Sequence, residues 1–250
     1  MKKIFAIVFV AIMLSGAASA VQFGEMVDYP TAGTLARATY SINLKMQPVG
    51  GLLLGFNFGL FDRLNFGFAY GGDNIIGYGD PDWNPQPGFT AKYRIFDESY
   101  YGPGVAIGFN NQGNGPYMEN RYLTKSPGFY AVASKNYRFM GTLAFHGGAN
   151  YSIEDRDNPN DNSINFFGGL EKSLNPELWL AAEYDLALND NYEDQQYGEG
   201  YGYLNLGLRW LFNQKLMMEF DLKNILRNGP EGQESAQVGR TVKIAYYDAF

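Results

Sequence analysis

Apolar side chains occupy every second position of two adjacent stretches, residues 51–61 and 64–72. The positions between them carry mostly glycine, alanine or asparagine. A period of two predicts β-strands, because successive side chains of a strand point to opposite faces of a sheet. The apolar residues are Leu52, Leu54, Phe56, Phe58 and Leu60, then Leu64, Phe66, Phe68 and Tyr70. Two consecutive strands therefore share one apolar face and one face of small, polar side chains.

The same alternation continues along the chain and predicts twelve strands. Their expected ranges are 34–46, 51–61, 64–71, 88–96, 103–110, 128–136, 140–153, 163–172, 177–188, 201–211, 215–225 and 237–248. No helical periodicity and no run of about 18 apolar residues follows residue 20. From the second strand on, the links alternate between short turns and long polar loops. Short turns on one rim and long loops on the other are typical of bacterial outer-membrane barrels.

A soluble β-sandwich would produce the same alternation in any single strand. Two features favour a membrane barrel instead: the apolar face recurs in almost every strand, and tyrosines cluster near the expected strand ends. The chain also ends on an aromatic residue, Phe250, which resembles the terminal signal that the barrel assembly machinery reads. We therefore predict an all-β fold, a closed antiparallel up-and-down transmembrane β-barrel of about 12 strands. Its surroundings would be outer-membrane lipid and lipopolysaccharide.

The first 20 residues have the pattern of a secretory signal peptide. Lys2 and Lys3 precede an apolar run at positions 4–14, and Ala18 and Ala20 supply the small residues before a cleavage site. The expected organisation is a cleaved signal peptide at 1–20, an N-terminal periplasmic segment at 21–33 and the barrel at 34–250. The chain has no cysteine and a formal charge of −7, which disfavours binding to nucleic acid.

The small, polar face is assigned to the lumen, because lipid contacts the apolar face. The ionisable residues expected to line this lumen are Arg37, Lys45, Lys92, Arg94, His146, Glu171, Glu183, Asp185, Arg209, Glu219, Asp221, Lys223 and Lys243. Two interpretations remain open. The charges pair across the lumen and close it, or opposing charged walls border a water-filled channel; a count of twelve strands does not decide between them.

The sequence offers little for catalysis or metal binding. His146 is the single histidine, and the residue two positions on is Gly148 rather than a serine. We therefore assign no catalytic residue, no metal and no cofactor. Acidic loops within 154–162 and 189–200 are expected to be solvated, with Ca²⁺ binding left open. One loop combines aromatic and acidic residues that suit a ligand such as a sugar: Tyr78, Asp80, Asp82 and Trp83.

Four stretches between residues 28 and 135 are similar to segments of a known barrel family. They are "PTAGTLARATYSINL", "GGLLLGFNFGLFDRLNFGFAYGG", "WNPQPGFTAKYRIFDES" and "SPGFYAVASKNY". These stretches resemble the YjbH-type proteins, which accompany exopolysaccharide-secretion operons. The resemblance implies an outer-membrane barrel with a role in polysaccharide export or surface display, and without an established enzyme activity.

Pattern and resemblance together predict a non-enzymatic outer-membrane barrel. Its function would be porin-like passage or export of small or saccharide solutes, or support of polysaccharide secretion. The alternative is a closed structural or adhesive barrel with acidic surface loops. A lipid-modifying barrel enzyme is a second alternative, for which His146 would be the candidate base.

Overall fold

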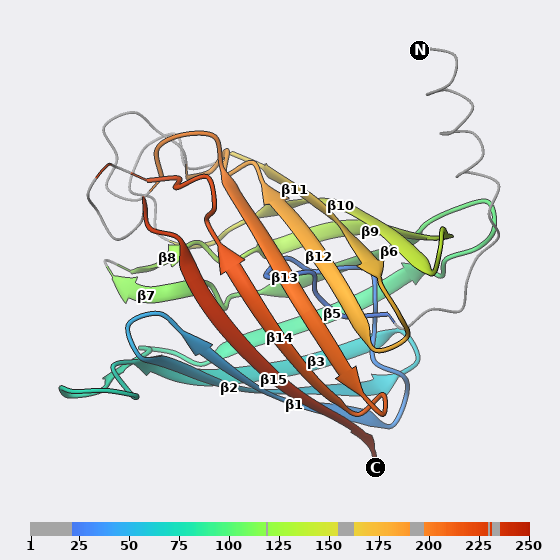
Figure 1. The fold of residues 1–250 in the computed structure, drawn as a ribbon, viewed down its shortest axis with the longest axis horizontal. Helices are drawn as coiled ribbons and strands as arrows, with labels where there is room; N and C mark the ends of the chain where they lie inside the picture. The colour runs from blue at the N-terminus through green and yellow to red at the C-terminus, as the bar shows by residue number, and fades with distance from the viewer. Residues whose placement is uncertain (1–21, 119, 155–162, 191–197, 230, 232–235) are drawn as a thin grey trace.

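The structure is a computed structural model that describes residues 22–118, 120–154, 163–190, 198–229, 231 and 236–250. In this part of the chain, twelve long strands form one closed antiparallel barrel (Figure 1). The strand β1 pairs with both β2 and β15, and β2 also pairs with β3, so the ring has no open edge. The predicted all-β barrel is confirmed.

The observed strands differ little from the predicted ranges. The barrel strands are β1 (Thr39–Gln47), β2 (Gly51–Phe61), β3 (Leu64–Asp73), β5 (Gly88–Phe96), β6 (Gly104–Asn110), β9 (Gly128–Arg138), β10 (Thr142–Tyr151), β11 (Asn165–Ser173), β12 (Leu178–Asp185), β13 (Tyr203–Phe212), β14 (Leu216–Lys223) and β15 (Gly239–Ala249). The first strand begins at Thr39 rather than residue 34, because residues 34–38 form the approach to the rim and make a turn instead of a ladder.

Short turns join the strands at one rim, and longer loops join them at the other. The chain ends at the short-turn rim (Figure 1), where Phe250 N donates to Ala38 O at 2.9 Å. By the usual orientation of such barrels, this rim is periplasmic and the long-loop rim is outside the cell. One long loop contains an additional hairpin that the sequence did not predict, β7 (Asn114–Met118) with β8 (Arg121–Thr124); the two-residue β4 (Asp82–Trp83) extends β3.

The outer face of the barrel is apolar. Leu208 of β13 lies opposite Leu180 and Phe220 on the two flanking strands, and all three side chains are exposed. Each of the remaining barrel strands also carries at least one exposed large apolar side chain on this face. A closed sheet satisfies its own backbone hydrogen bonds, so this belt can face hydrocarbon. Within the described residues, no helix is long and apolar enough to span a membrane.

The lumen contains the N-terminal segment. Phe23, Met26, Val27 and Tyr29 are buried against the inner wall, and the expectation that residues 21–33 lie in the periplasm is therefore wrong for the described residues 22–33. The physical reason is that the inner wall carries large apolar side chains that this segment covers. Residues 1–20, the predicted signal peptide, lie outside the described residues.

An arginine on the outer face should destabilise the barrel. Leu208 lies near the middle of β13, and Leu208→Arg should lower the free energy of unfolding by about 2–4 kcal/mol, the cost of arginine near the bilayer midplane. Tyr201→Arg, in the loop before β13, should change it by less than about 0.5 kcal/mol. Denaturant unfolding in lipid vesicles measures both variants. Equal effects would mean that Leu208 does not face hydrocarbon.

Candidate functional site

Residues 22–33 form a hairpin inside the barrel, called here the lumen hairpin. Its two arms are joined by hydrogen bonds from Met26 N to Tyr29 O at 2.8 Å and from Thr31 N to Gly24 O at 3.1 Å. Val27 and Asp28 make the two-residue tip. The tip meets residues near the outer ends of β1, β12 and β14, whereas the base meets residues near the periplasmic ends. The hairpin thus points from the periplasmic rim toward the outside.

A single carboxylate holds the tip. Glu183 Oε2 accepts the backbone N–H groups of Val27, Asp28 and Tyr29 at 3.1, 2.9 and 2.7 Å. Its other oxygen accepts the Asn205 amide at 2.9 Å. Buried backbone N–H groups are costly to leave without acceptors, and a tight tip exposes several at once. Glu183 therefore satisfies the donors that the hairpin cannot satisfy itself.

Two lysines hold the side chain of the tip. Lys45 Nζ lies 3.1 Å and Lys223 Nζ 2.5 Å from the same oxygen of Asp28. Both ammonium groups also bind the side-chain oxygen of Asn114, from the loop hairpin β7–β8. Two positive charges and one negative charge thus meet at the point where the lumen hairpin approaches the outer loops.

Other lumen cations bind the backbone oxygens of the hairpin. Lys92 Nζ donates to the carbonyls of Gly24, Thr31 and Gly33 at 2.5, 3.0 and 3.1 Å. Further donors are Arg94 Nε to Ala32 O, Lys243 Nζ to Val27 O and Arg209 to Glu25 O. These basic lumen residues therefore bind the backbone of the lumen hairpin and do not line an empty channel wall.

Apolar contacts complete the docking. Phe23 packs edge-on against Trp179, with ring centroids 5.4 Å apart, and Tyr29 stacks on Phe167 at 4.4 Å. Met26 is fully buried beside this second pair. At roughly 25 cal/mol per Å² of apolar surface, each buried ring contributes a few kcal/mol. The hairpin and β9–β15 thus form the apolar core of the protein.

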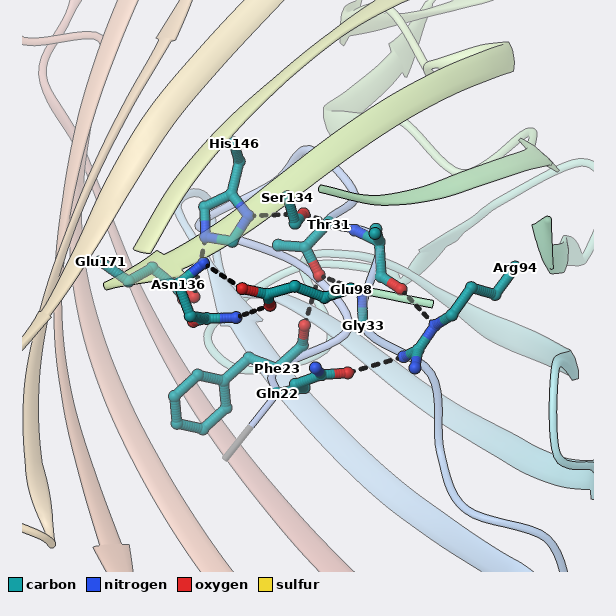
Figure 2. Close-up of a pocket in the computed structure, with 12 residues that line it drawn as sticks. Gln22, Phe23, Thr31, Gly33, Arg94, Glu98, Ser134, Asn136, His146 and Glu171 are labelled. Atoms are coloured by element: carbon teal, nitrogen blue, oxygen red, sulfur yellow. Dashed lines mark hydrogen bonds and ion pairs between the residues drawn. The ribbon is translucent and has the colours of Figure 1, made fainter. Parts of the chain in front are cut away.

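A buried polar network lies beside the hairpin on the β9–β11 wall (Figure 2). His146 stands between Ser134 and Glu171, at 2.8 Å from Ser134 Oγ and 3.2 Å from Glu171 Oε2. Glu171 also binds Arg209, whose guanidinium pairs with Glu219 at 2.6 Å. The order serine, histidine, carboxylate is the order of a hydrolase triad.

The surroundings of this array do not suit a hydrolase. Ser134 Oγ already accepts the N–H of Ala32 from the hairpin at 2.8 Å. The adjoining cavity measures about 20 Å³ and has room for about one water molecule. A substrate carbonyl has no access to Ser134 while the hairpin is in place. His146 thus orients the hydroxyl of Ser134, and Ser134 in turn binds the backbone of the hairpin at Ala32.

The structure places every predicted lumen residue inside the barrel except Arg37. Arg37 precedes β1 at the periplasmic rim and is exposed, since the strand to which it was assigned begins two residues later. Asp185 accepts the Tyr29 hydroxyl at 2.8 Å, and Asp221 lies 3.7 Å from Lys243. The acids and bases therefore do not form opposing walls; most of them meet at the hairpin.

The candidate ligand loop faces away from the lumen. Trp83 stacks parallel on Tyr70 of the outer face, with ring centroids 5.8 Å apart, and Tyr78 is fully exposed. Asp80 and Asp82 are exposed as well. An aromatic pair that continues the apolar belt at the outer rim fits the interfacial girdle of a barrel better than a sugar site.

The first acidic residue of each of the two acidic outer loops, Glu154 and Asp190, is packed against β8 rather than solvated as the sequence predicted. Arg121 of β8 is fully buried and pairs with Asp190 at 2.8 Å. Glu154 accepts the N–H groups of Tyr122 and Ser126 at 2.9 and 2.7 Å, and its burial raises the pKa of this carboxyl. The described residues contain no group of acids arranged to hold a metal ion, and residues 155–162 and 191–197 lie outside them.

A cavity of about 770 Å³ remains beside the lumen hairpin. The hairpin packs mainly on β9–β15, and the cavity runs between the hairpin and the wall of β1, β2, β3 and β5, and also borders parts of β13, β14 and β15. Its lining reaches from Lys215 and Asp248 at the periplasmic rim to Gln112 and Asn114 in an outer loop. The wall between combines small polar side chains with apolar ones; the polar ones include Ser41, Asn43, Asn57, Asn65 and Thr90.

Comparisons with known proteins support the fold. No family model and no curated protein matches this sequence. A KdgM porin has a TM-score of 0.51 at 9% identity, with 83% of this chain and 98% of that chain covered. A NanC porin matches with a TM-score of 0.46 at 8% identity over 84% and 99% of the two chains. The outer membrane phospholipase A of Escherichia coli matches with a TM-score of 0.43 at 10% identity over 96% of each chain.

The fold of this chain is thus the one also found in the KdgM porin. Together with the apolar belt, it confirms the outer membrane as the location of this chain.

Loss of the Glu183 carboxylate should free the hairpin tip. In Glu183→Gln an amide nitrogen must face either Asn205 or the tip N–H groups, all of which are donors. Hydrogen bonds to charged groups contribute about 1.5–3 kcal/mol, so the amides of Val27–Tyr29 should exchange with deuterium about ten- to a hundredfold faster. Glu199→Gln, in an exposed outer loop, is the matched control. Unchanged exchange in Glu183→Gln would contradict the assigned role.

Proposed function

We propose that the protein is a non-enzymatic outer-membrane channel through which small polar solutes, including saccharides, diffuse past the lumen hairpin. The cavity along β1–β5 carries this proposal, because its lining includes residues of both rims. In this scheme the hairpin narrows the barrel from one side and leaves a single polar path on the other.

The chemistry of the path supports hydroxylated solutes. Hydroxyl and amide groups such as those of Ser41, Asn57 and Thr90 both donate and accept hydrogen bonds, as sugar hydroxyls do. The KdgM porin, which has the same fold, supports the channel, and the YjbH-type resemblance, which implies polysaccharide export, supports saccharides as the solute class.

Lipopolysaccharide is the proposed neighbour of the outer rim, and recognition of Phe250 by the assembly machinery stays a prediction. The ring of Phe250 lies on the outer face at the periplasmic rim, 5.4 Å from that of Tyr40, where such a factor has access to it.

A larger side chain on the free wall should narrow the channel. A Cβ at Gly55 would meet no heavy atom closer than 3.6 Å, so the position accepts a side chain that then enters the cavity. Gly55→Gln should lower single-channel conductance in planar bilayers by about half or more, given the small cross-section of a twelve-stranded barrel. Leu54→Gln, on the lipid face, is the control and should leave conductance unchanged.

The same measurement separates the proposal from the closed structural barrel. Discrete conductance steps in the wild-type protein support a channel. Their absence in a correctly folded protein, judged by the heat-dependent gel shift of closed barrels, would favour the structural alternative. Deletion of residues 22–33 should raise the conductance in either case, because it removes the hairpin.

A further inference from the structure

The tip of the lumen hairpin occupies a site that has the features of an anion-binding site. Lys45 and Lys223 come from β1 and β14, with β15 between them, and their ammonium groups converge on one oxygen of Asp28. The Asp28 side chain is 7% exposed, and those of Lys45 and Lys223 are 15% and 12% exposed. Two ammonium groups held this close repel each other, and an anion between them offsets this repulsion.

The remaining partner at this point is neutral. Asn114 Oδ1 accepts from both lysines, and it supplies a dipole but no charge. Glu183 is used by the backbone N–H groups of the tip and does not take the place of Asp28. Asp28 is therefore the carboxylate that both lysines contact directly.

The site borders the proposed path. Asp28, Lys45 and Asn114 all line the cavity of about 770 Å³. A solute in the cavity therefore passes Lys45 and Asp28 directly, and it reaches Lys223, which binds the same oxygen of Asp28, when Asp28 moves aside. A carboxylate on that solute can then take the place of the Asp28 carboxylate. Asp28 belongs to a hairpin tip rather than to the wall, so exchange requires a movement of the tip and no rearrangement of the barrel strands.

We propose that Lys45 and Lys223 form an anion subsite that Asp28 fills as an internal competitor, and that small hydroxylated carboxylates in the channel bind there by displacing it. The inference rests on the proposed function, since it names the class of solute that the channel favours. The carboxylate of the solute binds the two ammonium groups, and its hydroxyls bind Asn43 and Asn114, which line the same part of the cavity.

The signs of two substitutions distinguish competition from a structural role. Asp28→Asn removes the competing charge and leaves both lysines in place. If Asp28 occupies the site more than nine-tenths of the time, this variant should bind a carboxylate about tenfold or more tightly than the wild-type protein. Lys223→Gln removes half of the subsite and should weaken binding below detection. A purely structural Asp28 would give unchanged or weaker binding in Asp28→Asn.

The test is calorimetric titration of the full chain in detergent with gluconate, and with sorbitol as a neutral compound of the same length. We expect the wild-type protein to bind gluconate and not sorbitol, Asp28→Asn to bind gluconate more tightly, and Asp80→Asn, in an exposed loop, to match the wild type. The heat-dependent gel shift verifies that each variant is folded. Should Asp28→Asn misfold, Lys45→Gln and Lys223→Gln against the wild type still test the subsite.

Each outcome bears on one proposal. Equal binding of gluconate and sorbitol, no binding of gluconate by any folded variant, or no gain in Asp28→Asn overturns the subsite and leaves the channel intact. Titration in detergent needs no conduction. Absence of conductance together with the expected pattern of gluconate binding would therefore overturn the channel and retain the subsite.

Discussion

Ionised and backbone polar groups in a narrow barrel need partners, and this requirement organises the lumen. Glu183 receives three backbone N–H groups from the hairpin, and Lys92 donates to three of its carbonyls. Neither set is satisfied without the other, because the hairpin lacks a neighbouring strand and the wall lacks enough counter-charges. The position of the hairpin, and with it the position of the remaining cavity, follows from this mutual satisfaction.

The sequence predicts the barrel well because a period of two is a direct consequence of strand geometry. Phase along each strand also places the lumen residues, and it fails only for Arg37, which lies in an approach segment with no ladder partner. Phase carries no information about what fills the lumen. The sequence therefore assigns Lys92, Glu183 and Lys243 to the inner face but does not identify the hairpin that they contact in the structure.

Two signals for that partner were present in the sequence. Tyr130, Phe167 and Trp179 have inward phase, and such large rings do not suit a water-filled lumen. The segment before the first strand carries Phe23, Met26 and Tyr29, which suit a periplasmic linker equally poorly. The inward-facing rings of the barrel wall and the apolar residues of segment 22–33 both lack another apolar surface to cover them. This indicates that they pack against each other. Segments this short are difficult to assign, because periodicity needs a longer window.

The lumen glycines serve different purposes on the two walls. A Cβ at Gly169 would lie 2.7 Å from the sulfur of Met26 and 2.3 Å from a carbonyl of β12, so this glycine makes room for the hairpin and for close strand packing. Gly55 has no such neighbour and borders the cavity. Small residues thus accommodate a peptide on one side and leave free volume on the other.

The place of the hairpin in the chain has a consequence for assembly. Residues 22–33 precede every strand, yet their acceptors and donors on β12–β15 are synthesised last. Contacts of such long sequence separation form slowly, because much chain must be ordered first. When β15 pairs with β1, the ring closes around residues 22–33, which precede all the strands in the chain. The hairpin therefore becomes enclosed only in the last step of barrel closure.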